Sequence, residues 1–138
     1  MTPSSRRTFL KTSALAATTA GLQSSLHVHA AGSDILRVGL IGCGGRGTGA
    51  ASQALSADPH VKLVAMGDVF EDRLQMSLRN LAALEGIAGK LDVPSERQFV
   101  GFDAYKQVLE SGVDVVLLAT PPHFRPMHLK AAVDAGVH

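Results

Sequence analysis

The residues with the clearest chemical meaning are three glycines that follow an apolar run near position 40. Gly42, Gly44 and Gly47 fall at the G-x-G-x-x-G spacing directly after the run Ile35 to Ile41. The first glycine of such a loop permits a tight turn, the second lets the backbone approach a pyrophosphate, and the third lets the next helix press on the sheet. The unpaired N–H groups of that helix favour an anion. The spacing therefore predicts a dinucleotide-phosphate site.

An acidic residue stands where the ribose of such a ligand would lie. A second apolar run, residues 61–66, ends in Gly67 and Asp68, and Asp68 is about twenty positions beyond the last glycine of the loop. A carboxylate there accepts from both ribose hydroxyls of NAD and repels the 2′-phosphate of NADP. We therefore expect NAD as the cofactor, with NADP as the alternative, because Arg46 and Arg73 can pair with that phosphate.

Composition limits the classes of protein that fit. The chain has 138 residues, of which 46% are hydrophobic and 18% charged, with a net charge of +1, so one globular domain is expected and a nucleic-acid partner is not. The single cysteine, Cys43, excludes an intramolecular disulfide and is read as a small residue fitted against backbone. No hydrolase triad, paired carboxylates or metal-ligand spacing stands out.

The first thirty residues are predicted to be an export signal. The segment Ser5 to Lys11 reads Ser-Arg-Arg-Thr-Phe-Leu-Lys, and a mildly apolar stretch, Thr12 to Leu22, follows it. This resembles a twin-arginine (Tat) signal, with Val28 and Ala30 as the small residues before cleavage. A membrane anchor needs about 20 strongly apolar residues, and a transit peptide is the other alternative. The interpretation implies the Tat translocase as partner and a periplasmic location.

Apolar runs and helical periodicity alternate along the rest of the chain. Strands are expected at 35–41, 61–66, 98–100 and 113–119, the last covered on both faces. Helices are expected over 48–56, from Glu71 with Leu74, Leu78, Leu81 and Leu84 inward, over 103–110 with Asp103 as N-cap, and over 126–135. The predicted fold class is α/β, a Rossmann-type doubly wound parallel sheet, incomplete with about four strands, in the order three, two, one, four.

Several of these stretches together resemble one enzyme family. The run Gly-Leu-Ile-Gly-Cys-Gly-Gly-Arg-Gly, the Gly67-Asp68 strand end, the loop Ala119 to His123 and the closing Ala135 to His138 are similar to the Gfo/Idh/MocA family. That family consists of NAD(P)-dependent oxidoreductases acting mostly on sugars, sugar acids and polyols. By position, the resemblance implies that the pyrophosphate contacts are Gly42, Gly44, Gly45, Arg46 and Gly47, that Asp68 binds the adenosine ribose, and that Thr120, Pro121, Pro122 and His123 lie on the nicotinamide side.

The resemblance also implies a domain organisation. Residues 1–30 would be the signal and 31–138 a truncated N-terminal NAD(P)-binding domain, since the family's E-K-P motif and its substrate domain would follow His138. We therefore expect a fragment of an exported oxidoreductase that binds the cofactor but by itself does not catalyse hydride transfer. A homo-oligomer is one form that the protein could take. The alternatives are a non-catalytic nucleotide-binding module and, for His123, a solvated turn residue without a role.

Overall fold

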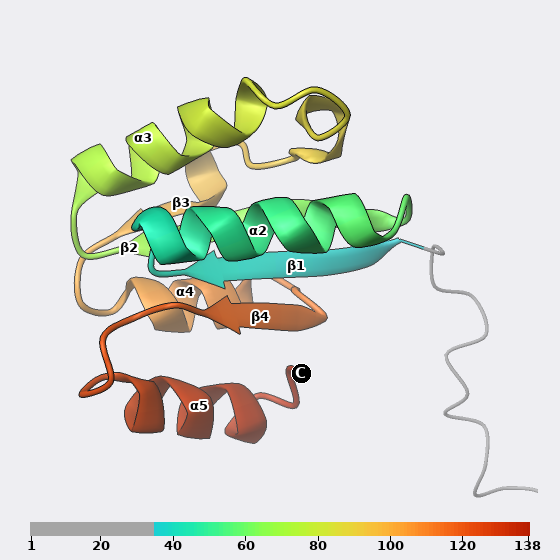
Figure 1. Cartoon of the computed structure of the whole chain (residues 1–138). Coiled ribbons are helices and arrows are strands. Elements are labelled where there is room, and N and C mark those ends of the chain that lie inside the picture. The colour runs from blue at the N-terminus through green and yellow to red at the C-terminus, as the bar shows by residue number, and fades with distance from the viewer. Residues whose placement is uncertain (1–34) are drawn as a thin grey trace, which may run out of the picture. The chain divides into compact units, whose positions relative to one another are not determined.

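The computed structural model describes residues 35–138 as a single parallel sheet with helices on both faces. The sheet order is β3-β2-β1-β4 (Figure 1). Its strands are β1 (Leu36–Ile41), β2 (Val61–Asp68), β3 (Gln98–Val100) and β4 (Val115–Leu118). The predicted α/β class and strand order are therefore confirmed. The predicted signal, residues 1–30, lies outside the described residues.

Four α-helices within residues 35–138 complete three layers. Helices α2 (Gly45–Ala57) and α3 (Glu71–Ala82) cover one face of the sheet, whereas α4 (Ala104–Glu110) and α5 (Arg125–Asp134) cover the other. Two short 3-10 turns, η1 (Ala88–Lys90) and η2 (Ser95–Arg97), lie between α3 and β3. The strands are parallel, and the arrowheads of β1 and β4 point to the same side in Figure 1.

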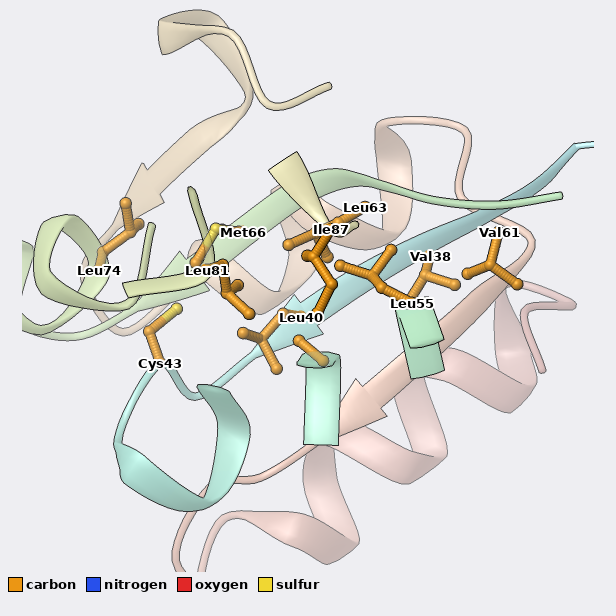
Figure 2. Close-up of a cluster of buried hydrophobic side chains, with 11 residues drawn as sticks. Val38, Leu40, Cys43, Leu55, Val61, Leu63, Met66, Leu74, Leu81 and Ile87 are labelled. Atoms are coloured by element: carbon orange, nitrogen blue, oxygen red, sulfur yellow. The ribbon is translucent and has the colours of Figure 1, made fainter. Parts of the chain in front are cut away.

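The alternation of side chains along β1 divides the core between the two faces. Val38 and Leu40 point to the α2–α3 side, and Ile41 points to the α4–α5 side, as the two-residue period of a strand requires. Figure 2 shows the first cluster, in which Leu40 and Leu55 are almost fully buried and the Cys43 side chain lies at one end. Each such aliphatic side chain contributes about 1.5 to 3 kcal/mol on burial.

Two local expectations need correction, and a third, on β4, is confirmed in part. Leu74 and Leu81 are fully buried as expected, but Leu84 is 42% exposed because α3 ends at Ala82, before the apolar period reaches it. Strand β4 does pack on both faces, with Leu117 against one cluster and Val116 and Leu118 against the other, but it is only half-buried because it lies at the edge of the sheet. Asp103 does precede α4, but its carboxylate pairs with Lys106 Nζ at 2.8 Å and makes no capping hydrogen bond.

The outer edge of β4 is partly paired by the last residue of the chain given. Val116 N donates to the carbonyl oxygen of His138 at 2.7 Å, and His138 N donates to the carbonyl oxygen of Asp114 at 3.1 Å. These two bonds flank one residue, which is the pattern of a parallel ladder. His138 thus occupies the position of a further parallel strand beside β4.

The start of α2 is packed directly on the turn that leaves β1. Gly42 has a φ of +96°, which L side chains rarely adopt. A Cβ built on Gly47 would lie 1.8 Å from the carbonyl oxygen of Gly42, closer than any real contact. The turn and the helix can therefore meet only if position 47 carries no side chain.

Gly47→Ala should destabilise the fold by about 3 kcal/mol or more, because the clash is with backbone and cannot be relieved by a rotamer change. Gly49→Ala, in the same helix and with no atom within 4 Å of its added Cβ, should instead be neutral or stabilise by up to about 1 kcal/mol. Urea unfolding followed by circular dichroism measures both. Equal stabilities of the two variants would contradict the packing argument.

Candidate functional site

A cleft of about 540 Å³ opens at the carboxyl ends of the strands. Strand β2 lies on one side of β1 and β4 lies on the other, so the order of the strands reverses at β1. Such a reversal leaves a crevice between the connections that follow the two neighbouring strands. Four connections contribute to the walls. They are the glycine loop (Gly42, Gly44, Arg46), the end of β2 (Gly67–Phe70, with Arg73), the β3–α4 turn (Gly101, Phe102, Ala104, Tyr105) and the β4–α5 segment (Ala119–Pro121, Phe124, Arg125, His128).

The structure brings most of the sequence-predicted site residues to this cleft. The predicted residues that line it are Gly42, Gly44, Arg46, Asp68, Thr120 and Pro121. Gly45 is exposed at the start of α2, and Gly47 is buried beneath that helix. Pro122 and His123 are exposed and do not line the cleft. The predicted contacts of all ten residues with a ligand stay predictions.

The N-terminus of α2 leaves room for a phosphate group. Gly44 is the N-cap residue, no side chain caps the helix there, and its first turn holds no acidic residue. A Cβ on Gly44 would meet only Arg73 Nη1, at 3.7 Å, and one on Gly45 would meet nothing within 4 Å. Amide groups with free space in front of them, at the positive end of a helix dipole, are suited to an anion.

Asp68 ties the glycine loop to the next connection of the chain. Its Oδ2 accepts from Cys43 N at 2.6 Å, and its Oδ1 accepts from Phe70 N at 2.9 Å. Both bonds join an ionised group to a backbone amide, which makes them stronger than neutral hydrogen bonds. A carboxylate has about four acceptor positions, so Asp68 keeps the capacity to accept from ligand hydroxyls.

Cys43 has a packing role, as its place in the loop predicted. It is 2% exposed, and its Sγ lies 3.5 Å from the carbonyl oxygen of Gly67, to which the thiol donates. Burial, together with the negative charge of Asp68, raises the pKa of the thiol to about 12. Because the thiolate is the reactive form, this cysteine is unsuited to nucleophilic chemistry.

Sequence reasoning missed His128, which is 6% exposed and lines the cleft. Its ring stacks on Tyr105 with centroids 4.3 Å apart, and its Nδ1 lies 3.2 Å from Thr120 Oγ1. Burial lowers the pKa of His128. Its position four residues before the buried Ala132, on the same face of α5, was the available signal that this histidine points inward.

Aromatic rings continue from His128 along the cleft. Phe124 lies 6.1 Å from the His128 ring and 6.4 Å from that of Phe102, measured between centroids. Phe70 and Phe102 also line the cleft, and they are 58% and 70% exposed. These large apolar side chains are therefore available to a ligand. We use the name aromatic wall for Phe102, Tyr105, Phe124 and His128.

Positive charge predominates around the cleft. Arg46, Arg73 and Arg125 line it, and Asp68 is the acidic residue among its lining groups. Arg125 Nε donates to the carbonyl oxygen of Thr120 at 2.8 Å, and the Arg73 guanidinium lies 5.7 Å from the centre of the Phe70 ring. Such a balance favours an anionic ligand. Within residues 35–138, no cluster of three or more acidic, histidine or cysteine side chains is placed to hold a metal ion, and no helix is long and apolar enough to cross a membrane.

Solved structures that align with this chain include dehydrogenases and a ketoreductase in complex with nicotinamide cofactors. Scyllo-inositol dehydrogenase from Lactobacillus casei with bound NAD(H) and scyllo-inositol aligns at a TM-score of 0.56 and 20% identity, over 75% of this chain and 26% of that one. The WlbA dehydrogenase from Bordetella pertussis, in complex with NADH and UDP-GlcNAcA, aligns at 0.54 and 25% identity over 75% and 26%. A 3-ketoreductase variant from Actinomadura kijaniata, in complex with TDP-benzene and NADP, aligns at 0.55 and 25% over 75% and 28%.

These neighbours are Gfo/Idh/MocA-type enzymes. The resemblance predicted from the sequence is thus confirmed, with the described fold as its common ground. This chain spans about a quarter of the length of the solved chains, 26% to 28% of those three. No protein-family model and no curated protein sequence matches it.

The Cys43 thiol should resist alkylation in the folded chain. With a pKa of about 12, about one thiol in ten thousand is ionised at pH 8, so we expect labelling by iodoacetamide to be at least about a thousandfold slower than in the urea-unfolded chain. Mass spectrometry of timed samples measures both rates, and the unfolded chain is the internal control. Rapid labelling of the folded chain would refute the buried position of the thiol.

Proposed function

We propose that the chain binds NAD(H) as the cofactor domain of an oxidoreductase that acts on a sugar, a sugar acid or a polyol. The observation that carries the proposal is the uncapped N-terminus of α2, which faces the cleft where the strand order reverses. Asp68, which also lines this cleft, accepts a hydrogen bond from Cys43 N in the glycine loop. The solved neighbours with bound NAD(H), NADH or NADP support the cofactor class. The polyol and nucleotide-sugar ligands in two of them support the substrate class.

Each part of the dinucleotide has a suitable place. The pyrophosphate fits at the Gly44–Arg46 backbone, and the adenosine ribose fits near the Asp68 carboxylate. The aromatic wall and Phe70 offer apolar faces to a purine ring, in a cleft whose volume of about 540 Å³ lies in the range of ligand sites. The nicotinamide would lie beyond Thr120 and Pro121, toward β4, and would supply the hydride acceptor.

Gly44→Ala separates cofactor binding from folding. Its φ of −69° is ordinary for any residue, and the added Cβ meets only the flexible end of Arg73, so the fold should be retained. The methyl group would stand between the backbone and the pyrophosphate, and we expect at least tenfold weaker binding of NADH, measured by fluorescence titration. Gly49→Ala, on α2 away from the cleft lining, is the matched control. Equal affinities of Gly44→Ala and the control would overturn the proposed site.

We also propose a preference for NAD over NADP, based on the carboxylate of Asp68. At an effective dielectric of about 20, two unit charges 4 Å apart interact by about 4 kcal/mol, and screening leaves room for a tenfold preference, which corresponds to about 1.4 kcal/mol. Titration with NADH and NADPH should therefore differ by about tenfold in the wild type and by less in Asp68→Asn, which keeps the shape of the side chain. Equal wild-type affinities would assign the choice to Arg46 and Arg73.

Export by the twin-arginine route belongs to the same proposal, with the periplasm as destination. The motif Ser5 to Lys11 supports it, and a protein that acquires its cofactor in the cytoplasm has reason to cross the membrane folded. Replacing Arg6 and Arg7 by Lys should leave the protein in the cytoplasm, as cell fractionation would measure. Replacing Lys11 by Arg, outside the arginine pair, is the control. Unchanged delivery of the Lys–Lys variant would remove the export proposal.

A further inference from the structure

Ser77 is a buried polar side chain on the α2–α3 side of the sheet. It is 1% exposed, and it lies on the face of α3 that carries Leu74 and Leu81 into the core. A hydroxyl buried in such a place costs free energy unless it is hydrogen-bonded. Its partner is Thr48, near the start of α2, and the two hydroxyl oxygens are 2.8 Å apart. The pair therefore joins α3 to the helix that begins at the glycine loop.

The acceptors within reach decide which hydroxyl of the pair donates. Thr48 Oγ1 lies 3.0 Å from the carbonyl oxygen of Gly44 and 3.4 Å from that of Cys43, so the Thr48 proton has acceptors in the glycine loop. Within residues 35–138, Thr48 is the hydrogen-bond partner of the Ser77 side chain, and the Ser77 proton would have no acceptor if Thr48 donated to it. A hydroxyl has one proton to donate and two lone pairs that accept. Ser77 therefore donates to Thr48, and Thr48 donates to Gly44.

The Gly44 carbonyl oxygen accepts from two donors. Besides the Thr48 hydroxyl, it accepts from Thr48 N at 2.9 Å, which is the first backbone bond of α2. A trans peptide is planar, and its N–H points opposite to its C=O. With the Gly44 carbonyl held along the helix, the Gly45 N–H of the same peptide points out of the N-terminus of α2, where space is left for an anion. Two donors on the two lone pairs fix this peptide plane, whereas the backbone bond by itself permits it to tilt.

We propose that Ser77 and Thr48 are positioning residues of the phosphate site: their hydroxyl groups form a chain that ends on the Gly44 carbonyl and holds the Gly45 N–H toward the pyrophosphate. We use the name hydroxyl chain for these hydrogen bonds from Ser77 to Gly44. Each group donates to the next, so an anion bound at Gly45 N polarises the whole chain in one direction, and the bonds strengthen one another. The role in binding rests on the proposed function, whereas the hydroxyl chain itself does not.

The glycine loop is thereby held from two neighbouring elements. Asp68, at the end of β2, accepts from Cys43 N at 2.6 Å, and Ser77 of α3 reaches Gly44 through Thr48. The glycines of the loop have no side chains with which to fix its conformation, and ordering them costs more conformational entropy than ordering other residues. Side chains from other elements must therefore fix the loop. The carboxylate holds the peptide before Cys43, and the hydroxyl chain holds the peptide after Gly44.

The first measurement tests the hydroxyl chain in the ligand-free protein by NMR. The signal of the Gly44 carbonyl carbon should move upfield in Thr48→Val, which keeps the shape of the side chain but removes its hydrogen bonds. It should move in the same direction by a smaller amount in Ser77→Ala, and Thr48→Ser should restore it. The matched control is Ser56→Ala, because Ser56 Oγ donates to the Ser52 carbonyl oxygen of the same helix at 2.8 Å, away from the glycine loop. A Gly44 signal that stays in place in Thr48→Val or in Ser77→Ala would overturn the proposal whether or not the chain binds a dinucleotide.

The second measurement is fluorescence titration with NADH. Affinity should fall about tenfold in Thr48→Val and about threefold in Ser77→Ala, because the charge-assisted bond from Gly45 N–H to the pyrophosphate is then less well directed. Thr48→Ser should recover most of the loss, since it restores the hydroxyl. Ser56→Ala should bind as the wild type does. Unchanged affinity in Thr48→Val would refute the positioning role, even where the Gly44 signal had moved.

Ile87→Val separates positioning from stability. Ile87 is buried in the same cluster as Leu74 and Leu81 but outside the glycine loop, so its lost methyl group lowers stability without removing a bond of the hydroxyl chain. Urea unfolding gives the stability of each variant, and Ile87→Val should keep the NADH affinity of the wild type although it is less stable. Affinities that follow stability across all variants would refute the positioning role but keep the proposed function. No binding by the wild type would refute the proposed function, and the NMR signal of Gly44 would still decide the hydroxyl chain.

Discussion

The contact between Gly47 and the carbonyl oxygen of Gly42 is the constraint on which the rest of the site depends. A Cβ at position 47 would lie 1.8 Å from that oxygen, so α2 can begin at this height above the sheet only with glycine there. The same contact directs the N-terminus of α2 toward the strand ends. An uncapped helix end that faces a cleft is a place for an anion, and here close packing of backbone on backbone produces it.

Asp68 extends this constraint to the neighbouring strand. By accepting from Cys43 N and Phe70 N, its carboxylate fixes the glycine loop relative to the turn after β2, and it keeps acceptor positions for a ligand. The charge of Asp68 also contributes to the raised pKa of the Cys43 thiol, although burial is the larger cause. One carboxylate thereby holds two loops together, contributes to the inertness of a cysteine and, in the proposed function, opposes the 2′-phosphate of NADP. The structural role and the proposed binding role of Asp68 are thus compatible.

The sequence by itself determined the main strands and helices, their order and the glycine-rich loop. Strong local signals carried these predictions: the G-x-G-x-x-G spacing, the apolar strands, and the alternation of strand and helix that leaves few sheet orders. It placed Asp68 and Thr120 at the carboxyl ends of the two strands that flank β1, and both line the cleft. It overextended the core at Leu84, where the apolar period continues after the helix has ended. Helix ends depend on packing and capping, which periodicity does not encode.

Only the tertiary structure decided which side chains form the far wall of the cleft. His123, beside two prolines, drew attention in the sequence, yet it is exposed, whereas His128 is buried and bonded to Thr120. The difference arises because His123 lies in the turn before α5, whereas His128 lies on the face of α5 that the packing of Ala132 turns inward. Phe102 of the turn before α4 and Tyr105 of α4 belong to the same wall, although they are more than fifteen positions from His128 in the chain. Such proximity between distant residues follows from strand order and helix packing, which no local pattern specifies.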